Sequence, residues 1–147
     1  MKIAVASDHA GYALKEAVKR HLTGRGETVV DFGAPGPEPS DYPDHGGAAA
    51  RAVAAGEAER GVLVCGSGQG MCMVANKVAG VRAALAWSAE IAELSRRHND
   101  ANVLCLPARF VTEGDALRIV DVWLATAFEG GRHARRVEKL MRQEEEE

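Results

Sequence analysis

The chain alternates short apolar runs with segments of helical periodicity, and this alternation limits its fold more than any other feature. The five apolar runs are too apolar for strands that face water on one side. The predicted strands cover residues 2–7, 27–33, 61–65, 81–87 and 102–107. The predicted helices cover residues 12–22, 45–58, 71–78, 88–99, 112–128 and 132–147. This order predicts an α/β fold: a Rossmann-like, doubly wound, five-stranded parallel sheet with helices on both faces, plus a C-terminal helix.

Length and charge restrict the kind of protein further. A chain of 147 residues fits a single domain spanning 1–147. Of its 21 acidic residues, four form the tail 144–147, which leaves 17 acidic against 18 basic residues. We expect the acidic tail to be solvated. The near-neutral remainder argues against nucleic acid as a partner.

The apolar runs and the cysteines indicate the cellular compartment that we expect for the protein. No apolar run approaches 18 residues, so we expect no membrane span, and Asp8 and His9 interrupt the N-terminal run too early for a signal peptide. The cysteines at 65, 72 and 105 are odd in number and lack paired-ligand spacing. They predict a reducing cytoplasm, without disulfides or a zinc site.

Ligands of such sheets bind beyond the carboxyl ends of the strands. Three stretches occupy that position: SDHAG (7–11), CGSGQG (65–70) and PARF (107–110). In CGSGQG the glycines at 66, 68 and 70 allow backbone N–H groups to converge on an anion at the start of a helix. The loop lacks the Gly-Lys-Ser/Thr of a Walker loop, and its third glycine comes one residue too early for a dinucleotide fingerprint. A simple glycine turn is the alternative.

Cys65 stands where this loop begins. A thiol at a helix N-terminus can act as a thiolate base or nucleophile, although a buried free cysteine is also common. Met71 occupies the position of the arginine in the Cys-x₅-Arg loop of small tyrosine phosphatases, which argues against phosphatase chemistry. We expect Cys72 and Cys105 to pack in the core.

Several polar residues are candidates for acid, base or anion contacts. Asp8 could orient a sugar hydroxyl or cap the following helix, and His9 could bind phosphate or carry a proton. His98, near the end of a helix, is favoured in its charged form and suits a proton donor, whereas a C-cap with Asn99 left-handed is the alternative.

Arg132 and Arg136 are four residues apart on the last predicted helix and share one face. Together they form a candidate anion clamp, with a solvated charged surface as the alternative. We expect Trp87 and Trp123 in the core, and His21 and His133 on the surface.

Several stretches together resemble the ribose-5-phosphate isomerase type B family, whose relatives include galactose-6-phosphate isomerase subunits. They extend from residue 3 to about 138: SDHAG, DYPD, GVLVCGSGQGM, ANK, LSRRHNDANVL, WL and FEGGRHARRV. The resemblance implies an aldose–ketose isomerase with Cys65 as the base and His98 as the ring-opening acid. Some members use a glutamate instead of the cysteine, but GMCMVANK contains no acid.

The resemblance also implies the substrate contacts. Asn99 and the loop backbone stabilise the enediolate oxygens, and Asp8 assists at ring hydroxyls. Ser67 positions the base or the hydroxyls, and Arg109 contacts the substrate. The loop residues are Gly66, Ser67, Gly68, Gln69 and Gly70, and the phosphate contacts are His9, Arg132 and Arg136.

We therefore expect interconversion of D-ribose 5-phosphate and D-ribulose 5-phosphate through an enediolate, without a metal or an organic cofactor. The alternatives are an isomerase of another sugar phosphate (allose or galactose 6-phosphate, or a tetrulose phosphate) and a non-catalytic phosphosugar-binding module. The family implies a homodimer or homotetramer with sites at subunit interfaces, so that Cys65 and His98 could come from different chains.

Overall fold

The computed structural model describes residues 1–145 and confirms the predicted α/β architecture. All strand pairs of its five-stranded sheet are parallel, in the order β2-β1-β3-β5-β4. The strands are β1 (Lys2–Ser7), β2 (Thr28–Asp31), β3 (Arg60–Cys65), β4 (Ala83–Leu85) and β5 (Val103–Pro107). The α-helices are α1 (Tyr12–Gly24), α2 (Tyr42–Ala54), α3 (Gln69–Asn76), α4 (Ala89–Asn99), α5 (Glu113–Ala125) and α6 (Arg132–Arg142).

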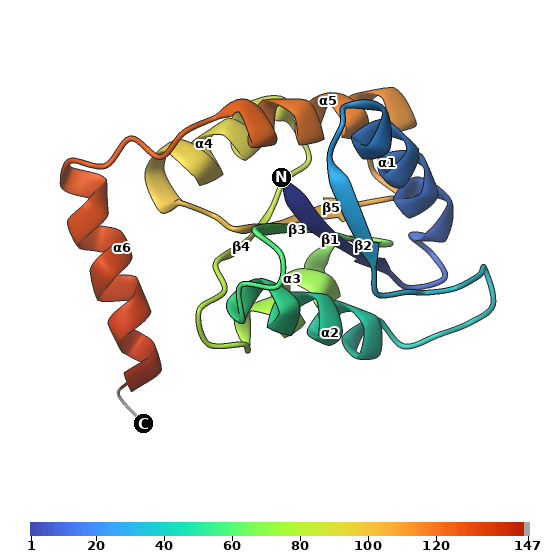
Figure 1. The fold of residues 1–147 in the computed structure, drawn as a ribbon, viewed down its shortest axis with the longest axis horizontal. Helices are drawn as coiled ribbons and strands as arrows, with labels where there is room; N and C mark the ends of the chain where they lie inside the picture. The colour runs from blue at the N-terminus through green and yellow to red at the C-terminus, as the bar shows by residue number, and fades with distance from the viewer. Residues whose placement is uncertain (146–147) are drawn as a thin grey trace.

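Helices cover both faces of the sheet. Helices α1, α4 and α5 lie on one face, and α2 and α3 lie on the other (Figure 1). Alternate residues of the central strands supply the two cores: Val62 and Leu104 pack with Trp123 of α5, whereas Leu63 and Cys105 pack in the layer beneath α2 and α3. Apart from Arg60 at the start of β3, all residues of β3 and β5 are buried, as expected for apolar parallel strands.

Local signals place most helix starts. Ser88 Oγ accepts a hydrogen bond from the N–H of Ile91 at 3.2 Å, and Thr112 Oγ1 accepts one from Asp115 at 3.1 Å, which confirms both predicted caps. Helix α2 begins at Tyr42, three residues before its predicted start. Pro43 lies in its first turn, where the fixed φ of proline suits a helix start.

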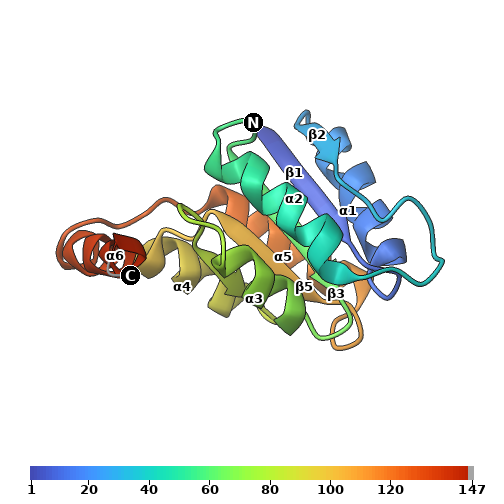
Figure 2. The same cartoon turned by 90° about the horizontal axis from the view of Figure 1, so that it is seen from below.

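Helix α6 stands beside the sheet rather than on it (Figures 1 and 2). Among its residues His133 is the one that is buried, and Leu140 is exposed. Beyond it, Glu144 and Glu145 are exposed, and Glu144 accepts a hydrogen bond from the N–H of Gly80 at 2.9 Å. The rest of the predicted solvated tail, residues 146–147, lies outside the described residues. Over residues 1–145, every helix is too short or too polar to cross a bilayer.

Two predicted positions are wrong. Trp87 is 57% exposed rather than buried, because β4 ends at Leu85 and leaves Trp87 in the loop beyond an edge strand. His133 is 6% exposed rather than on the surface, because its ring stacks on that of His98.

Strand order fixes where a ligand can bind. β2 lies on one side of β1 and β3 on the other, so the chain changes direction across the sheet between β1 and β3. A crevice opens at such a switch point, outside the carboxyl ends of the two strands.

Candidate active site

A cavity of about 250 Å³ lies at this switch point. Its walls come from the loops after β1, β3 and β5, the three places that the sequence predicts, and from the start of α2. The lining residues are Asp8, His9, Ala10, Tyr42, Cys65, Gly66, Ser67, Gly70 and Arg109. Sequence reasoning missed Tyr42; the stretch DYPD, which contributes to the family resemblance, is the signal that could have found it.

Cys65 ends β3 and forms part of the cavity wall. It is 5% exposed, and its carbonyl oxygen accepts a hydrogen bond from the N–H of Ala108 at 2.9 Å. The next carbonyl, that of Gly66, accepts one from Arg109 at 2.9 Å. The loop after β5 is therefore fastened to the start of the glycine loop, and a thiol and a guanidinium line the same cavity.

Gly68 turns the chain from this loop into α3. Its φ is +76°, in the left-handed region, and a Cβ there would lie 2.5 Å from Leu85 Cδ1. The left-handed φ requires glycine, and a Cβ would also crowd the backbone of Leu106 and Pro107 at 3.2 Å. The turn directs the first N–H groups of α3 toward the carboxyl edge of the sheet, where the positive end of the helix favours an anion.

Asp8 and His9 are both held by contacts with backbone groups, Asp8 within its own loop and His9 with the loop that precedes α2. Asp8 Oδ1 accepts a hydrogen bond from the N–H of Gly11 at 3.0 Å, so this buried carboxylate stabilises the entry into α1 as well as lining the cavity. His9 Nδ1 lies 3.2 Å from both the N and the O of Ser40. This contact fixes the ring through Nδ1 and leaves Nε2 for a ligand.

Ser67 and Gln69 differ in their position. Ser67 lines the cavity, and its Oγ accepts a hydrogen bond from the N–H of Gln69 at 3.4 Å. The exposed Gln69 instead lines an adjacent hollow with Trp87 and Phe110. The side chain of Gln69 thus lies outside the cavity over Cys65.

The remaining predicted residues form a second group at the opposite edge of the sheet. His98 and Asn99 end α4, and Arg132 and Arg136 are exposed on α6. His98 Nε2 lies 3.9 Å from Glu129 Oε2, and the His98 and His133 rings stack with centroids 4.2 Å apart. The left-handed residue after α4 is Asp100 rather than Asn99.

Register separates the two groups within one chain. α4 leads into β5, whose first residue, Val103, pairs with Gly61, whereas its last residue, Pro107, pairs with Cys65. Five residues of strand span roughly 13 Å. The chain therefore does not bring His98 or Asn99 to its own Cys65.

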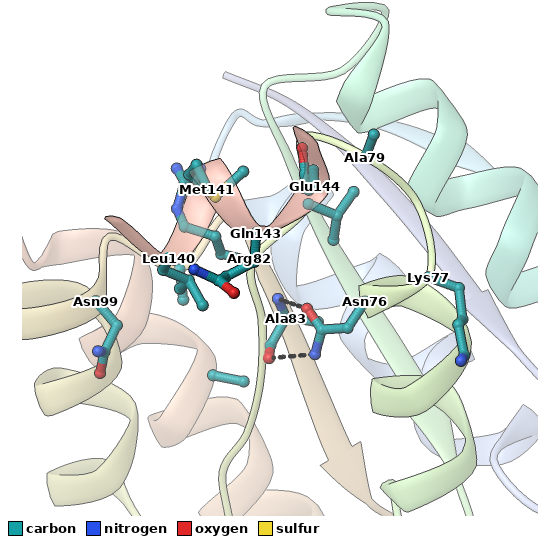
Figure 3. A pocket seen from close by; sticks show the side chains of 13 residues that line it. Asn76, Lys77, Ala79, Arg82, Ala83, Asn99, Leu140, Met141, Gln143 and Glu144 are labelled. Atoms are coloured by element: carbon teal, nitrogen blue, oxygen red, sulfur yellow. Dashed lines mark hydrogen bonds between the residues drawn. The ribbon is translucent and has the colours of Figure 1, made fainter. Parts of the chain in front are cut away.

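Asn99 lines a different hollow, of about 610 Å³, between α6 and the edge strand β4 (Figure 3). Leu140 and Met141 of α6 line it, and Asn76 is paired through two hydrogen bonds with the backbone of Ala83. Of the predicted site residues, Asn99 alone reaches it, so this larger hollow is separate from the cavity over Cys65.

Three side chains at and around His98 could approach a metal ion. Potential ligand atoms of His98, Glu129 and His133 all lie within 4.8 Å of one another. However, the two rings are stacked only 14° from parallel, and imidazole binds a metal through a lone pair in the ring plane. The lone pairs of the two rings therefore cannot both point at one ion in this arrangement.

Comparison with known proteins identifies the relatives of the chain. Residues 3–140 match the Ribose/Galactose Isomerase family. The chain is 46% identical to ribose-5-phosphate isomerase B of Escherichia coli (95% of this chain, 93% of that protein), and 40% identical to D-erythrulose-4-phosphate isomerase of Pectobacterium atrosepticum, with the same coverage. The crystal structure of ribose-5-phosphate isomerase B from Mycoplasma genitalium with bound ribulose-5-phosphate has a TM-score of 0.95 and 46% identity, covering 99% of this chain and 97% of that one.

Proposed function

The chain belongs to the ribose/galactose isomerase family, and we propose that it interconverts D-ribose 5-phosphate and D-ribulose 5-phosphate. The observation that carries the proposal is the cavity at the β1–β3 switch point, where a buried thiol meets an aspartate, a histidine and an arginine. The 46% identity to ribose-5-phosphate isomerase B over nearly the whole chain supports the choice of sugar.

In this proposal Cys65 is the catalytic base. Its thiolate removes the proton from C2 of the open-chain aldose, and the same sulfur returns that proton to C1. The intermediate enediolate carries negative charge on its oxygens. Backbone N–H groups between Gly66 and Gly70, at the positive end of α3, are placed to stabilise that charge.

Ring opening and phosphate binding need the second group of residues. His98 donates a proton to the furanose ring oxygen as the C1–O bond breaks, and the C1 hydroxyl releases its proton to solvent to leave the aldehyde. Arg132 and Arg136 bind the phosphate with His9. Since Cys65 and His98 lie at opposite edges of the sheet in one chain, we infer a homodimer, or a homotetramer built from two such dimers, in which each site combines two subunits.

The first experiment replaces Cys65 with serine and measures both turnover and binding. We expect turnover of D-ribose 5-phosphate to fall about 10²- to 10⁴-fold, the contribution typical of a positioned base, while calorimetry still detects substrate binding. If wild-type protein binds the sugar phosphate without isomerising it, a non-catalytic phosphosugar-binding module is the correct function instead.

The shared site has its own test. The inactive variants Cys65→Ser and His98→Asn are unfolded together and refolded as a mixture. If each site combines two chains, half of the dimers are mixed and each has one intact site, which restores about a quarter of wild-type activity. No recovery, with mixed dimers demonstrated by differently tagged chains, would place both residues of a site in one subunit.

Another sugar phosphate is the second candidate substrate, favoured by the 40% identity to D-erythrulose-4-phosphate isomerase. A panel of aldose phosphates ranked by kcat/KM separates the candidates. Best turnover on a tetrose phosphate, or on allose or galactose 6-phosphate, would change the assigned sugar but not the chemistry.

The free thiols at 65, 72 and 105 suit a reducing cytoplasm, where we expect the enzyme to work.

A further inference from the structure

Two of the three free cysteines have no part in the proposed reaction, yet they lie together beside the catalytic loop. Cys105, on β5, is fully buried and points into the layer beneath α2 and α3. Cys72, on α3, packs against the same apolar cluster but is only half-buried, so solvent reaches it. The pair thus combines an accessible thiol with a shielded one.

The surroundings of Cys72 place its sulfur against the sheet. Cys72 Sγ donates a hydrogen bond to the carbonyl oxygen of Ala83 at 3.5 Å, and Asn76 Nδ2 donates one to Cys72 Sγ at 3.6 Å. Ala83 is in β4, two residues before Leu85, which is the register partner of Cys105. Cys72 therefore lies over the strand adjacent to the one that carries Cys105.

Cys65 is less well placed to pair with Cys105. The register partner of Cys105 on β3 is Leu63, and Cys65 lies two residues further along the same face. The strand spacing and rise put the two Cα atoms roughly 8 Å apart. Disulfides generally need Cα atoms closer than about 7 Å. The sheet thus disfavours a Cys65–Cys105 bond, whereas Cys72 approaches the cluster that contains Cys105 from α3.

We propose that Cys72 and Cys105 form an intramolecular disulfide when the protein meets a peroxide, which makes this pair an oxidative modification site beside the catalytic loop. The Cys72 thiolate attacks one oxygen of hydrogen peroxide, the O–O bond breaks, and the departing hydroxide takes up a proton to become water. The Cys105 sulfur then attacks the resulting sulfenic acid. The S–S bond forms as the S–O bond breaks, and the hydroxide leaves with the Cys105 proton as a second water. Two thiols are oxidised by two electrons, and one peroxide is reduced.

The ionisation of the two thiols suits this order of events. A hydrogen bond from the Cys105 thiol outweighs desolvation and, together with Leu85 N–H and Asn76, lowers the pKa of Cys72 to about 7. The same contact with Cys72, followed by burial, raises the pKa of Cys105. Near neutral pH the accessible Cys72 is thus partly a thiolate, the form that peroxide oxidises, and Cys105 is the resolving thiol.

The bond would act on the loop through α3. The N–H of Cys72 donates to the carbonyl oxygen of Gly68 at 3.0 Å, so Cys72 belongs to the first turn that follows the catalytic glycines. A disulfide to β5 pulls this turn toward the sheet. We expect isomerase activity to decrease on oxidation and to return with dithiothreitol. This consequence rests on the proposed function, whereas formation of the bond does not.

The test maps the bond directly. Full-length protein is treated with a small excess of hydrogen peroxide, its free thiols are alkylated after denaturation, and its peptides are identified by mass spectrometry. We expect a Cys72–Cys105 cross-linked peptide that dithiothreitol removes, with Cys65 still available to the alkylating agent. The Cys65→Ser variant should form the same bond even though it cannot turn over substrate.

Cys72→Ser is the matched control and should give no cross-link. Because its side chain is half-buried and contacts backbone polar groups, serine should be tolerated; circular dichroism checks the fold. Cys105→Ala serves as a second control. A wild-type protein that keeps three free thiols, oxidises Cys72 no further than sulfinic acid without cross-linking, or pairs Cys65 with either partner would overturn the proposal.

Discussion

The imidazole rings of His98 and His133 stack with their centroids 4.2 Å apart and their planes 14° from parallel. His133 is buried, and among the described residues its Nε2 has no hydrogen-bond partner. Desolvation, followed by the charges of His98 and Arg132, lowers the pKa of His133 and favours its neutral form. Glu129, whose Oε2 lies 3.9 Å from His98 Nε2, accepts a hydrogen bond from Arg97 Nε at 3.0 Å. A buried neutral ring and a fixed carboxylate thus hold the proposed proton donor in place.

Removing the stacked ring should therefore impair turnover more than binding. We expect His133→Ala to lower kcat about 10- to 100-fold with a smaller change in KM, because a misplaced catalytic group loses rate without losing substrate affinity. His133→Phe, which retains an aromatic surface for stacking, should keep more of the wild-type kcat. Steady-state kinetics on D-ribose 5-phosphate measures both. Equal losses in the two variants would show that stacking does not position His98.

The two arginines of α6 should act on the phosphate. We expect Arg136→Ala to raise KM for D-ribose 5-phosphate about 10- to 100-fold, because hydrogen bonds to charged groups contribute about 1.5–3 kcal/mol. Arg142→Ala is the matched control: it is also exposed on α6, but it lies six residues beyond Arg136 and is paired with Glu138. Unchanged kinetics in Arg136→Ala would return this residue to a solvated surface role.

The turn at Gly68 should tolerate no side chain. Because φ is +76° and an added Cβ would lie 2.5 Å from Leu85 Cδ1, we expect Gly68→Ala to destabilise the protein by about 1–3 kcal/mol and to lower kcat. Gly114→Ala provides the comparison, since a Cβ at this position in α5 meets no atom within 4 Å. That variant should be neutral or stabilised by up to about 1 kcal/mol. Urea unfolding would contradict the prediction if the two variants were equally stable.

Periodicity and turn residues were sufficient to predict the sheet, because apolar parallel strands and capped helices leave local signals. They also predicted the three loops that surround Cys65, since the carboxyl ends of parallel strands share one edge. Before the structure, only the family resemblance implied that Cys65 and His98 could come from different chains. The structure supplies the physical reason, because α4 returns His98 to the opposite edge of the sheet from Cys65.

The two misplaced residues have the same origin. The apolar run that predicts a core position for Trp87 continues to residue 87, but pairing with β5 ends at Leu85. His133 is buried by a ring 35 residues earlier in the chain, which no periodicity of α6 indicates. In both cases a tertiary contact, or its absence, decides the burial of a residue whose local pattern is ambiguous.

Lys15 and Asp31 form an ion pair that should make the folded protein less stable at low pH. Lys15 Nζ, on a side chain only 1% exposed, lies 3.0 Å from Asp31 Oδ1 and donates to the carbonyl oxygen of Ala34 at 2.6 Å. Desolvation alone would raise the pKa of Asp31, but hydrogen bonds from Lys19, the Gly33 N–H and Lys15 outweigh it and lower that pKa. The folded protein therefore binds this proton less readily than the unfolded chain does.

The contribution of Asp31 is thus present above the unfolded-state pKa of about 3.9 and is lost as pH falls through the lower folded-state value. We expect Asp31→Asn to reduce stability by about 1–3 kcal/mol near neutral pH, because the buried Lys15 ammonium then keeps only the more distant carboxylate of Glu16, at 3.8 Å, as a charged partner. The variant should also lose less stability than wild type between about pH 5 and about pH 3. Urea unfolding at fixed protein concentration measures both effects. If the free energies of unfolding of the two proteins decreased in parallel across this pH range, protonation of Asp31 would not be the cause of the acid sensitivity.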